Sequence, residues 1–182
     1  MDLLDLDRRA CELNIKLLKE MSRSDLSMAT PCAEWNIREL VQHQVDTTAT
    51  FVAEVRGTKI TGAPVGNDPL GVYTAAVQEA WNAFDTAGML DAEWNFPGFG
   101  KQSGRTIVAA HYLDNLIHAW DLARAVGQHL TFDDDMAQAA TRIASHYPEG
   151  ISAFAPPVQV DENATTTDRL VASLGRSPHW PA

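Results

Sequence analysis

Apolar residues recur every three or four positions over most of this chain, and this spacing constrains the fold more than any other feature. From Leu3 to Met21 they stand at positions 3, 6, 10, 13, 17 and 21, which places them along one face of an α-helix. Similar stripes cover residues 37–56, 69–84, 104–126 and 133–146. Segments that alternate apolar and polar residues, as many β-strands do, are nearly absent. The sequence therefore predicts an all-α fold.

Capping residues and helix breakers mark where these helices begin and end. Pro31 disfavours helical backbone at the residue before it, so a new element begins after this point. Asn36 is placed to cap the second helix, and Gly57 stands just past its end. Asp68 followed by Pro69 is typical of a helix cap and the first helical residue. These signals predict helices that pack together as a bundle.

Two connections are too rich in glycine and proline to be helical. Residues 57–69 hold three glycines and two prolines, which predicts a long crossover between the second and third helices. In residues 88–101, Trp94, Phe96 and Phe99 stand among breakers, and we expect a loop over the mouth of a site in preference to a strand. After Pro148, one short helix near 167–174 and further prolines predict a strap. We expect residues 1–182 to form one domain.

Charge and composition limit the partners of the chain. The formal charge of −10, from 14 basic and 24 acidic residues, disfavours nucleic acid, whose binding needs clustered Lys and Arg. No apolar run reaches about 18 residues and no basic leader opens the sequence, so we expect neither a membrane span nor a secretory signal. Cys11 and Cys32 have no regular spacing, which favours the reducing cytoplasm. We expect a cytoplasmic protein with a small-molecule partner, and a homodimer is among the assemblies expected.

The helix near residues 104–126 holds the residues best suited to chemistry. It is apolar nearly all round, as expected of a helix buried among neighbours, so its polar residues need a reason. At 100° per residue, His111, Asp114, His118 and Asp121 fall within an arc of about 80°. Asp114 and His118 are four apart, so they rise from adjacent turns and can converge on one ion. Burying either group alone would cost several kcal/mol, which a metal would compensate.

Residue spacing leaves two interpretations of this row open. Asp114 and His118 can bind a metal, or they can hydrogen-bond each other in the core. A third ligand would come from another helix, and His43 on the second helix is the candidate. It lies on the flank of its apolar stripe, so the alternative to a metal ligand is a histidine packed at the seam between two helices. The remaining histidines outside the row lie near predicted helix ends or in the tail: His129, His146 and His179.

Two separated motifs resemble one known family. The segment TPCAEWNIRELVQH, from Thr30 to His43, is similar to the TPC-x-x-W-x-x-x-x-L-x-x-H segment of the mycothiol-dependent maleylpyruvate isomerase N-terminal family, within the DinB and YfiT-like group. The segment DNLIHAWDLA, from Asp114 to Ala123, is similar to the family's E-x-x-x-H-x-W-D-L-A helix. The terminal segment DRLVASLGRSP also resembles that family. The resemblance implies a DinB-like four-helix bundle with a long crossover between helices 2 and 3, plus an extra helix and a C-terminal strap.

The resemblance also implies a metal site and a class of reaction. Bundles of this group bind a divalent metal through ligands that correspond here to His43, Asp114 and His118. Zinc is the first expectation, with nickel and iron as alternatives. Three protein ligands leave a position for an exchangeable ligand, which in the family can be a low-molecular-weight thiol of the mycothiol type. The implied function is a metal-dependent, thiol-using transferase or isomerase. A non-catalytic metal-binding or small-molecule-binding module and a bundle without metal are the alternatives.

One departure from the family concerns a ligand. The family usually has glutamate where this chain has Asp114, so either the helices sit closer here or the metal site is weakened or lost. Cys32, in the first motif, has no identified base beside it, and we expect it to be a partly buried cysteine that acts as a small apolar residue. We therefore assign no catalytic residue.

Two further polar residues share the row. Asp121 is expected to accept a hydrogen bond from His118, or to pair with Arg38 or Arg124. His111 is expected to be a core histidine bonded to a carbonyl, with the roles of fourth ligand or general base as alternatives.

Overall fold

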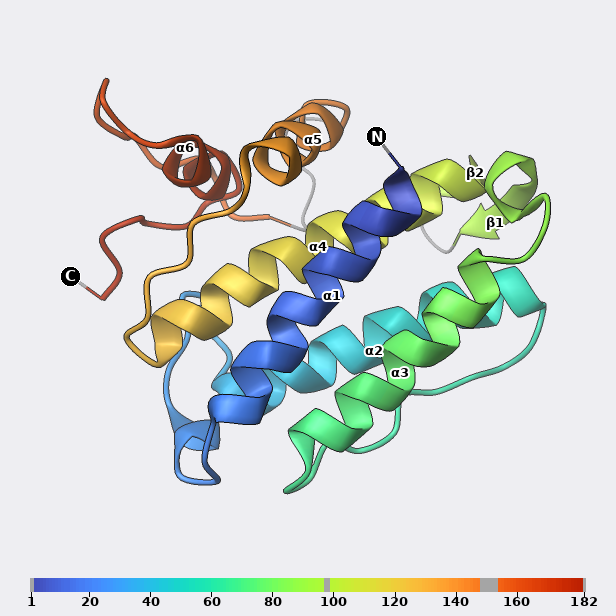
Figure 1. Ribbon diagram of the computed structural model, residues 1–182, viewed down its shortest axis with the longest axis horizontal. Helices are drawn as coiled ribbons and strands as arrows, with labels where there is room; N and C mark the ends of the chain where they lie inside the picture. Colours follow the sequence, from blue (N-terminus) through green and yellow to red (C-terminus); the bar gives the residue numbers. More distant parts are fainter. Residues whose placement is uncertain (1, 97–98, 148–153, 182) are drawn as a thin grey trace.

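The computed structural model describes residues 2–96, 99–147 and 154–181, and four long helices dominate it (Figure 1). They are α1 (Leu3–Glu20), α2 (Ile37–Arg56), α3 (Pro69–Phe84) and α4 (Gly104–Ala125). Of two shorter helices, α5 (Asp134–Ala144) packs against α4, and α6 (Thr166–Ser173) packs against α5. The short 3₁₀ helices η1 (Asp25–Ser27) and η2 (Met89–Asp91) stand in connections. The predicted DinB-like helical bundle is confirmed, with helix ends within two residues of those expected.

The predicted caps account for these ends. Asn36 accepts from the backbone N–H of Glu39, whose side chain accepts from the N–H of Asn36, so both orphan donors are satisfied. Gly57 closes α2 with φ of 62°, in the left-handed region. Asp68 caps α3 by accepting from the N–H of Gly71, with Pro69 at the first helical position.

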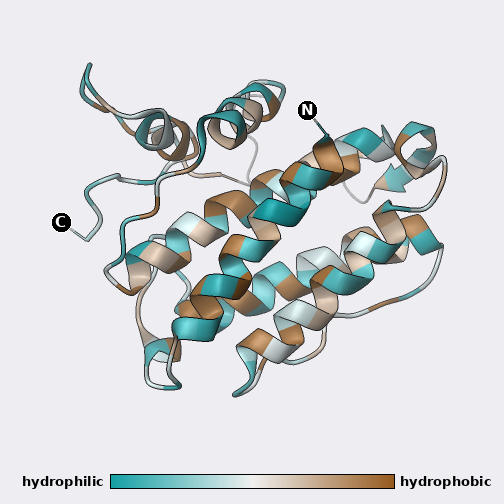
Figure 2. Ribbon diagram, viewed as in Figure 1, coloured by the Kyte–Doolittle hydropathy of each residue, from teal (hydrophilic) through white to brown (hydrophobic). Residues whose placement is uncertain are grey.

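Helix α4 is the centre of the bundle, as its composition predicts. Of its 22 residues, 16 are buried, because α1 and α2 cover one side and α5 covers another. Helices such as α1 carry both hydrophobic and hydrophilic residues and keep one face in solvent (Figure 2). The polar residues of α4 therefore lie inside the protein, where they need partners. None of the helices in the described part of the chain is long and apolar enough to cross a membrane.

The prediction for residues 88–101 is wrong. This segment contains an antiparallel hairpin, β1 (Glu93–Phe96) paired with β2 (Gly100–Ser103), while residues 97–98 lie outside the described residues. Phe96 stacks on Phe51 of α2 with ring centroids 4.9 Å apart, and Trp94 donates to the carbonyl of Met89. Packing against Phe51 and its neighbours stabilises the extended conformation. The prediction considered only the glycine and proline residues of the segment and not this packing.

The hairpin also lies away from the expected site. Phe51 is two turns beyond His43 on α2, and the described contacts of Trp94, Phe96 and Phe99 are with this far end of the bundle. An open hollow of about 480 Å³ beside Trp94 is lined by residues of this end, such as Val55 and Met89. The mouth residues expected from the sequence are therefore not placed at the candidate metal ligands.

The tail after α5 returns to α4. Residues 148–153, where the expected strap begins, lie outside the described residues. Farther on, the N–H of Val158 donates to Ala172 of α6, and Arg124 of α4 donates to the carbonyl of Trp180. Leu170 and Val171 of α6 belong to the apolar cluster that joins α1, α4 and α5. The described tail therefore packs on the outer side of α4.

Candidate metal centre

The structure brings His43, Asp114 and His118 together between α2 and α4. Oδ1 of Asp114 lies 3.4 Å from Nε2 of His43 and 3.4 Å from Nε2 of His118. The i,i+4 spacing on α4 supplies two of these groups, and the flank of α2 supplies the third. One atom from each side chain can thus face a common point, and all three atoms lie within 4.8 Å of one another.

These separations fit one cation. Donor atoms about 2.1 Å from a tetrahedral zinc ion lie about 3.4 Å from each other. The two measured distances from Asp114 have this value. A hydrogen bond of ordinary strength would be shorter, near 2.8–3.0 Å. The arrangement is therefore closer to a set of ligands than to a hydrogen-bonded chain.

The second carboxylate oxygen of Asp114 supports the same interpretation. Oδ2 is buried and has no hydrogen-bond partner among the described residues. A buried carboxylate oxygen without a partner is costly, and such a group in a native protein calls for an explanation. A cation bound at Asp114 would supply it.

Asp114 and His118 are also close enough to form an ion pair when His118 is protonated. Burial by itself raises the pKa of Asp114, but His118 and His43 outweigh it and hold this pKa well below its usual range. Burial also lowers the pKa of His118, but the Asp114 and Asp121 carboxylates raise it well above that of a free histidine. The proton on His118 thus takes the place that a cation would have.

The opposite side of the His118 ring is fixed by Asp121. Nδ1 of His118 donates to Oδ2 of Asp121 at 2.9 Å, which leaves Nε2 directed toward Asp114. Metal-bound histidines typically donate their second ring nitrogen to a carboxylate in this way. The expectation that Asp121 accepts from His118 is confirmed.

The ionic partner of Asp121 was not predicted. It is Arg176, from the tail, and neither Arg38 nor Arg124: Nη2 of Arg176 lies 3.0 Å from Oδ2 of Asp121. Burial raises the pKa of Asp121, but Arg176 and His118 together lower it below its usual range. The sequence carried no signal for this pair, because 55 residues separate its members.

Cys32 is not in the apolar setting that we expected. Its thiol donates to Oδ2 of Asp121 at 3.2 Å and accepts from Nη2 of Arg176 at 3.3 Å. Cys32, Asp121 and His118 could also group around an ion. The guanidinium already occupies the polar space beside Cys32 and Asp121, and its positive charge disfavours a cation there.

The TPC motif places an aromatic ring on the site. The Thr30 hydroxyl donates to the carbonyl of Trp35 at 2.8 Å and accepts from the N–H of Cys32, which closes the loop before α2. Trp35 stacks on His43 with centroids 4.4 Å apart and planes 28° from parallel. The side chain of His43 is 31% exposed and that of His118 only 6%, so the centre opens toward solvent on the His43 side.

The departure at Asp114 is accommodated by the fold. Although aspartate is one methylene shorter than glutamate, its Oδ1 reaches both histidines. The shorter side chain therefore still places a carboxylate oxygen between the two histidines.

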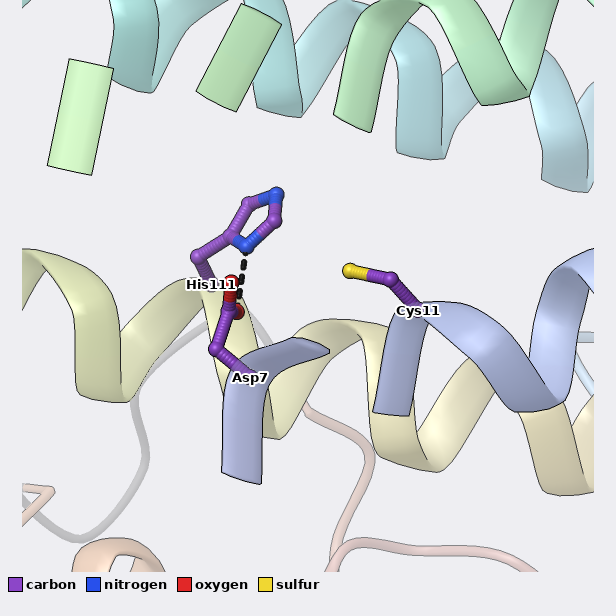
Figure 3. A group of neighbouring side chains, drawn as sticks. All are labelled: Asp7, Cys11 and His111. Atoms are coloured by element: carbon purple, nitrogen blue, oxygen red, sulfur yellow. Dashed lines mark hydrogen bonds and ion pairs between the residues drawn. The ribbon is translucent and has the colours of Figure 1, made fainter. Parts of the chain in front are cut away.

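His111 belongs to a different cluster, which Figure 3 shows. Nδ1 of His111 lies 2.6 Å from Oδ1 of Asp7 on α1, and Nε2 lies 3.0 Å from the hydroxyl of Thr48. Cys11 points into the same space. His111 is thus a core histidine, as expected, but its partners are a carboxylate and a hydroxyl in place of a carbonyl.

This second cluster is better explained as a buried polar pair than as a metal site. Oδ2 of Asp7, like that of Asp114, is buried without a hydrogen-bond partner among the described residues. Both ring nitrogens of His111, however, already have partners in the protein, and Asp7, Cys11 and His111 are each at most 1% exposed. Burial also raises the pKa of the Cys11 thiol well above its usual value, which disfavours the thiolate that a metal would need.

A buried amide network lies directly beside the ligands. Gln44, next to His43, donates to Asn14 of α1 at 3.0 Å. Asn115, next to Asp114, accepts from the hydroxyl of Tyr73 of α3 at 2.6 Å, and its backbone carbonyl accepts from Asn14. The network therefore ties all four long helices together at the level of the candidate centre.

This geometry defines a class of protein: a helical bundle in which two histidines and a carboxylate face one point between α2 and α4. The chain belongs to the mycothiol maleylpyruvate isomerase N-terminal domain family, whose model matches residues 8–123. This match confirms the resemblance that the two motifs indicated. It includes all three candidate ligands and excludes Arg176.

Similar proteins occur in Mycobacterium tuberculosis. Uncharacterized protein MT0763 of strain CDC 1551 and uncharacterized protein Rv0738 of strain H37Rv are each 29% identical to this chain over 182 residues. The alignment covers 97% of this chain and 99% of each relative. No solved structure gives a significant match.

Proposed function

We propose that this protein binds a divalent metal through His43, Asp114 and His118 and uses it as a thiol-dependent transferase or isomerase. The observation that carries the proposal is the position of Asp114. Its Oδ1 stands 3.4 Å from both histidine Nε2 atoms, while its buried Oδ2 has no hydrogen-bond partner in the part of the chain that the structure describes. A cation bonded to the Nε2 atoms of both histidines and to both carboxylate oxygens of Asp114 would satisfy both features.

Zinc fits this donor set best. Two imidazole nitrogens and one carboxylate oxygen are typical zinc ligands, and zinc accepts three protein ligands when a fourth position is left for an exchangeable one. Nickel and iron accept the same nitrogen and oxygen donors and are the alternatives. With both histidines neutral, one carboxylate leaves a net charge of about +1 on the occupied centre, which favours an anionic fourth ligand such as a thiolate.

Each residue has a defined part in this proposal. His43, Asp114 and His118 hold the ion, while Asp121 keeps Nε2 of His118 turned toward it. When bound, the metal would lower the pKa of an incoming thiol, so that the thiol binds as a nucleophilic thiolate at neutral pH. Trp35, which covers one face of His43, limits access to the partly exposed side of that ring.

The proposed thiol cosubstrate and reaction class are inferred from the matching family. The matching model describes the N-terminal domain of a mycothiol-dependent isomerase, so a thiol of that type is the proposed cosubstrate and a small electrophile is the proposed substrate. The same observation supports a second candidate, a non-catalytic module that binds metal or a small molecule, because the matched family is defined by one domain of an enzyme.

Elemental analysis tests whether the protein binds a metal through these residues. Protein purified in the presence of zinc should hold close to one equivalent, whereas the His118→Ala variant should lose it and the His129→Ala variant, changed at an exposed histidine outside the centre, should keep it. Less than about a tenth of an equivalent in the wild-type protein would contradict the proposal.

A panel of thiols and electrophiles then separates the two candidates. An enzyme should show metal-dependent consumption of at least one thiol, which His118→Ala abolishes. Bound metal without turnover with any thiol would favour the module.

A further inference from the structure

A buried arginine from the C-terminal tail reaches the back of the candidate centre. Arg176 is 8% exposed, although it lies on an irregular segment just after α6. Gly175 makes this approach possible: its φ is 82°, and a Cβ at this position would stand 2.6 Å from Ala155. The chain therefore turns sharply and directs the guanidinium toward α4.

The guanidinium contacts Asp121 with two of its nitrogens. Nη2 lies 3.0 Å and Nε lies 3.4 Å from the two carboxylate oxygens, while Nη1 donates to the carbonyl of Leu174 at 2.8 Å. The same Asp121 carboxylate holds Nδ1 of His118 at 2.9 Å. Arg176, Asp121 and His118 thus form a chain that ends at the proposed metal ligand.

Asp121 depends on this arginine because it is itself fully buried. A buried carboxylate needs a cationic partner or enough hydrogen bonds to remain charged and in place. His118 and the Cys32 thiol each offer Asp121 one donor, while Arg176 offers two further donors and a positive charge that remains when His118 is neutral.

We propose that Arg176 is a positioning residue for the metal centre, which holds Asp121 so that His118 presents Nε2 to the ion. The inference rests on the proposed function. It extends the centre beyond residues 8–123, because the C-terminal tail supplies a residue on which ligand geometry depends. Lysine would be a partial substitute, since a single ammonium cannot reproduce the planar pair of contacts.

The test compares metal affinity and ligand geometry in variants of the full chain. Affinity for zinc is measured by competition with a chelator, and geometry by the visible spectrum of the cobalt-loaded protein. We expect Arg176→Met to weaken zinc binding by about 10 to 100-fold, as removal of outer partners of metal ligands does, and to alter the cobalt spectrum. Arg176→Lys should recover part of the affinity. Arg169→Met, at an exposed arginine of α6, should bind zinc as the wild type does.

A double-mutant cycle shows whether Arg176 acts through Asp121. In the Asp121→Asn background, Arg176→Met should cause no further loss of affinity, because the carboxylate that it holds is already gone. If Arg176→Met alone does not fold, Arg176→Lys, which keeps a positive charge beside Asp121, takes its place in the cycle. The inference is overturned if folded Arg176→Met binds zinc like the wild type, or if its effect is undiminished in the Asp121→Asn background.

Failure of the proposed function would look different, because the wild-type protein itself would bind no metal. The inference is then tested on the metal-free protein by ¹⁵N NMR of the His118 ring. Arg176→Met should change the Nδ1 signal that reports the bond to Asp121, and an unchanged signal would refute the positioning role.

Discussion

Metal binding at neutral pH should release about one proton from His118. In the metal-free protein this ring lies 2.9 Å from Asp121 and 3.4 Å from Asp114. Burial lowers its pKa, but these two carboxylates raise it well above that of a free histidine. We therefore expect the ring to carry a proton on Nε2 at neutral pH, which a cation would have to displace.

The size of the effect follows from linkage. Each proton released makes the apparent affinity rise tenfold per pH unit, or about 1.4 kcal/mol. The slope of log Kd should therefore be at least about one per pH unit, and it should persist above pH ~6.5, where a free histidine would already have lost its proton. Competition by acid should thus begin at a higher pH than the ~6.5 expected of an unperturbed histidine ligand.

Calorimetry can count this proton. Zinc is titrated into the metal-free protein in two buffers of different ionisation enthalpy, and the difference in heat gives the number of protons released. Asp121→Asn should release fewer protons at neutral pH, because one of the carboxylates that raise the pKa of His118 is gone. Zinc binding without proton release, at neutral pH and one unit below, would show that His118 is neutral in the metal-free protein or is not a ligand.

Three further substitutions and one titration test other parts of the structure. Asp114→Glu should keep the fold and preserve zinc binding, since it restores the residue usual in the family; if circular dichroism shows it unfolded, Asp114 is a structural carboxylate. His118→Ala should remain helical and lose at least about 10 to 100-fold in metal affinity by chelator competition, and unchanged metal content would remove His118 from the site. His111→Ala should lower the free energy of unfolding in urea by about 3–5 kcal/mol, because Asp7 would stay buried without its partner, yet metal affinity should not change; a loss of metal would point to a shared centre. In the metal-free protein, the stability that His118 contributes should be complete below pH ~6.5 and lost as the pH rises through its raised pKa. The stability that Asp114 contributes should be lost as the pH falls below ~3.9. A urea midpoint that does not change on the alkaline side would contradict the ion pair.

Local patterns in the sequence were sufficient to predict the bundle and to bring together two of the candidate metal ligands. Helical periodicity and caps such as Asn36 and Asp68 depend on residues a few positions apart, and the structure has them as predicted. The i,i+4 spacing likewise placed Asp114 and His118 on one face of α4. His43 was the candidate third ligand because the other histidines outside the row lie near helix ends or in the tail, and the TPC-containing motif supported this choice. The structure brings it to the same point.

Contacts between distant segments could not be predicted in the same way. Asp7 and His111 are 104 positions apart, and nothing in either local pattern connects them. Arg176 comes from an irregular tail whose path depends on the turn at Gly175. The hairpin did leave a weak signal, because Glu93, Trp94, Asn95 and Phe96 alternate polar and apolar residues, but four residues are too few to outweigh the breakers that follow.

The amide network around Asn115 has a consequence for how the protein receives its ligand. Asn14, Gln44, Tyr73 and Asn115 interlock from four helices. A slide of α2 along α4 by one residue, about 1.5 Å, would break the bonds of Gln44 to Asn14 and Asn115. Since Gln44 and Asn115 adjoin His43 and Asp114, the same bonds set the ligand spacing before any ion arrives. Such a pre-organised site loses little binding free energy to rearrangement. Amide hydrogen exchange in α2 and α4 should therefore be alike with and without zinc, apart from the uniform slowing that ligand binding produces by mass action.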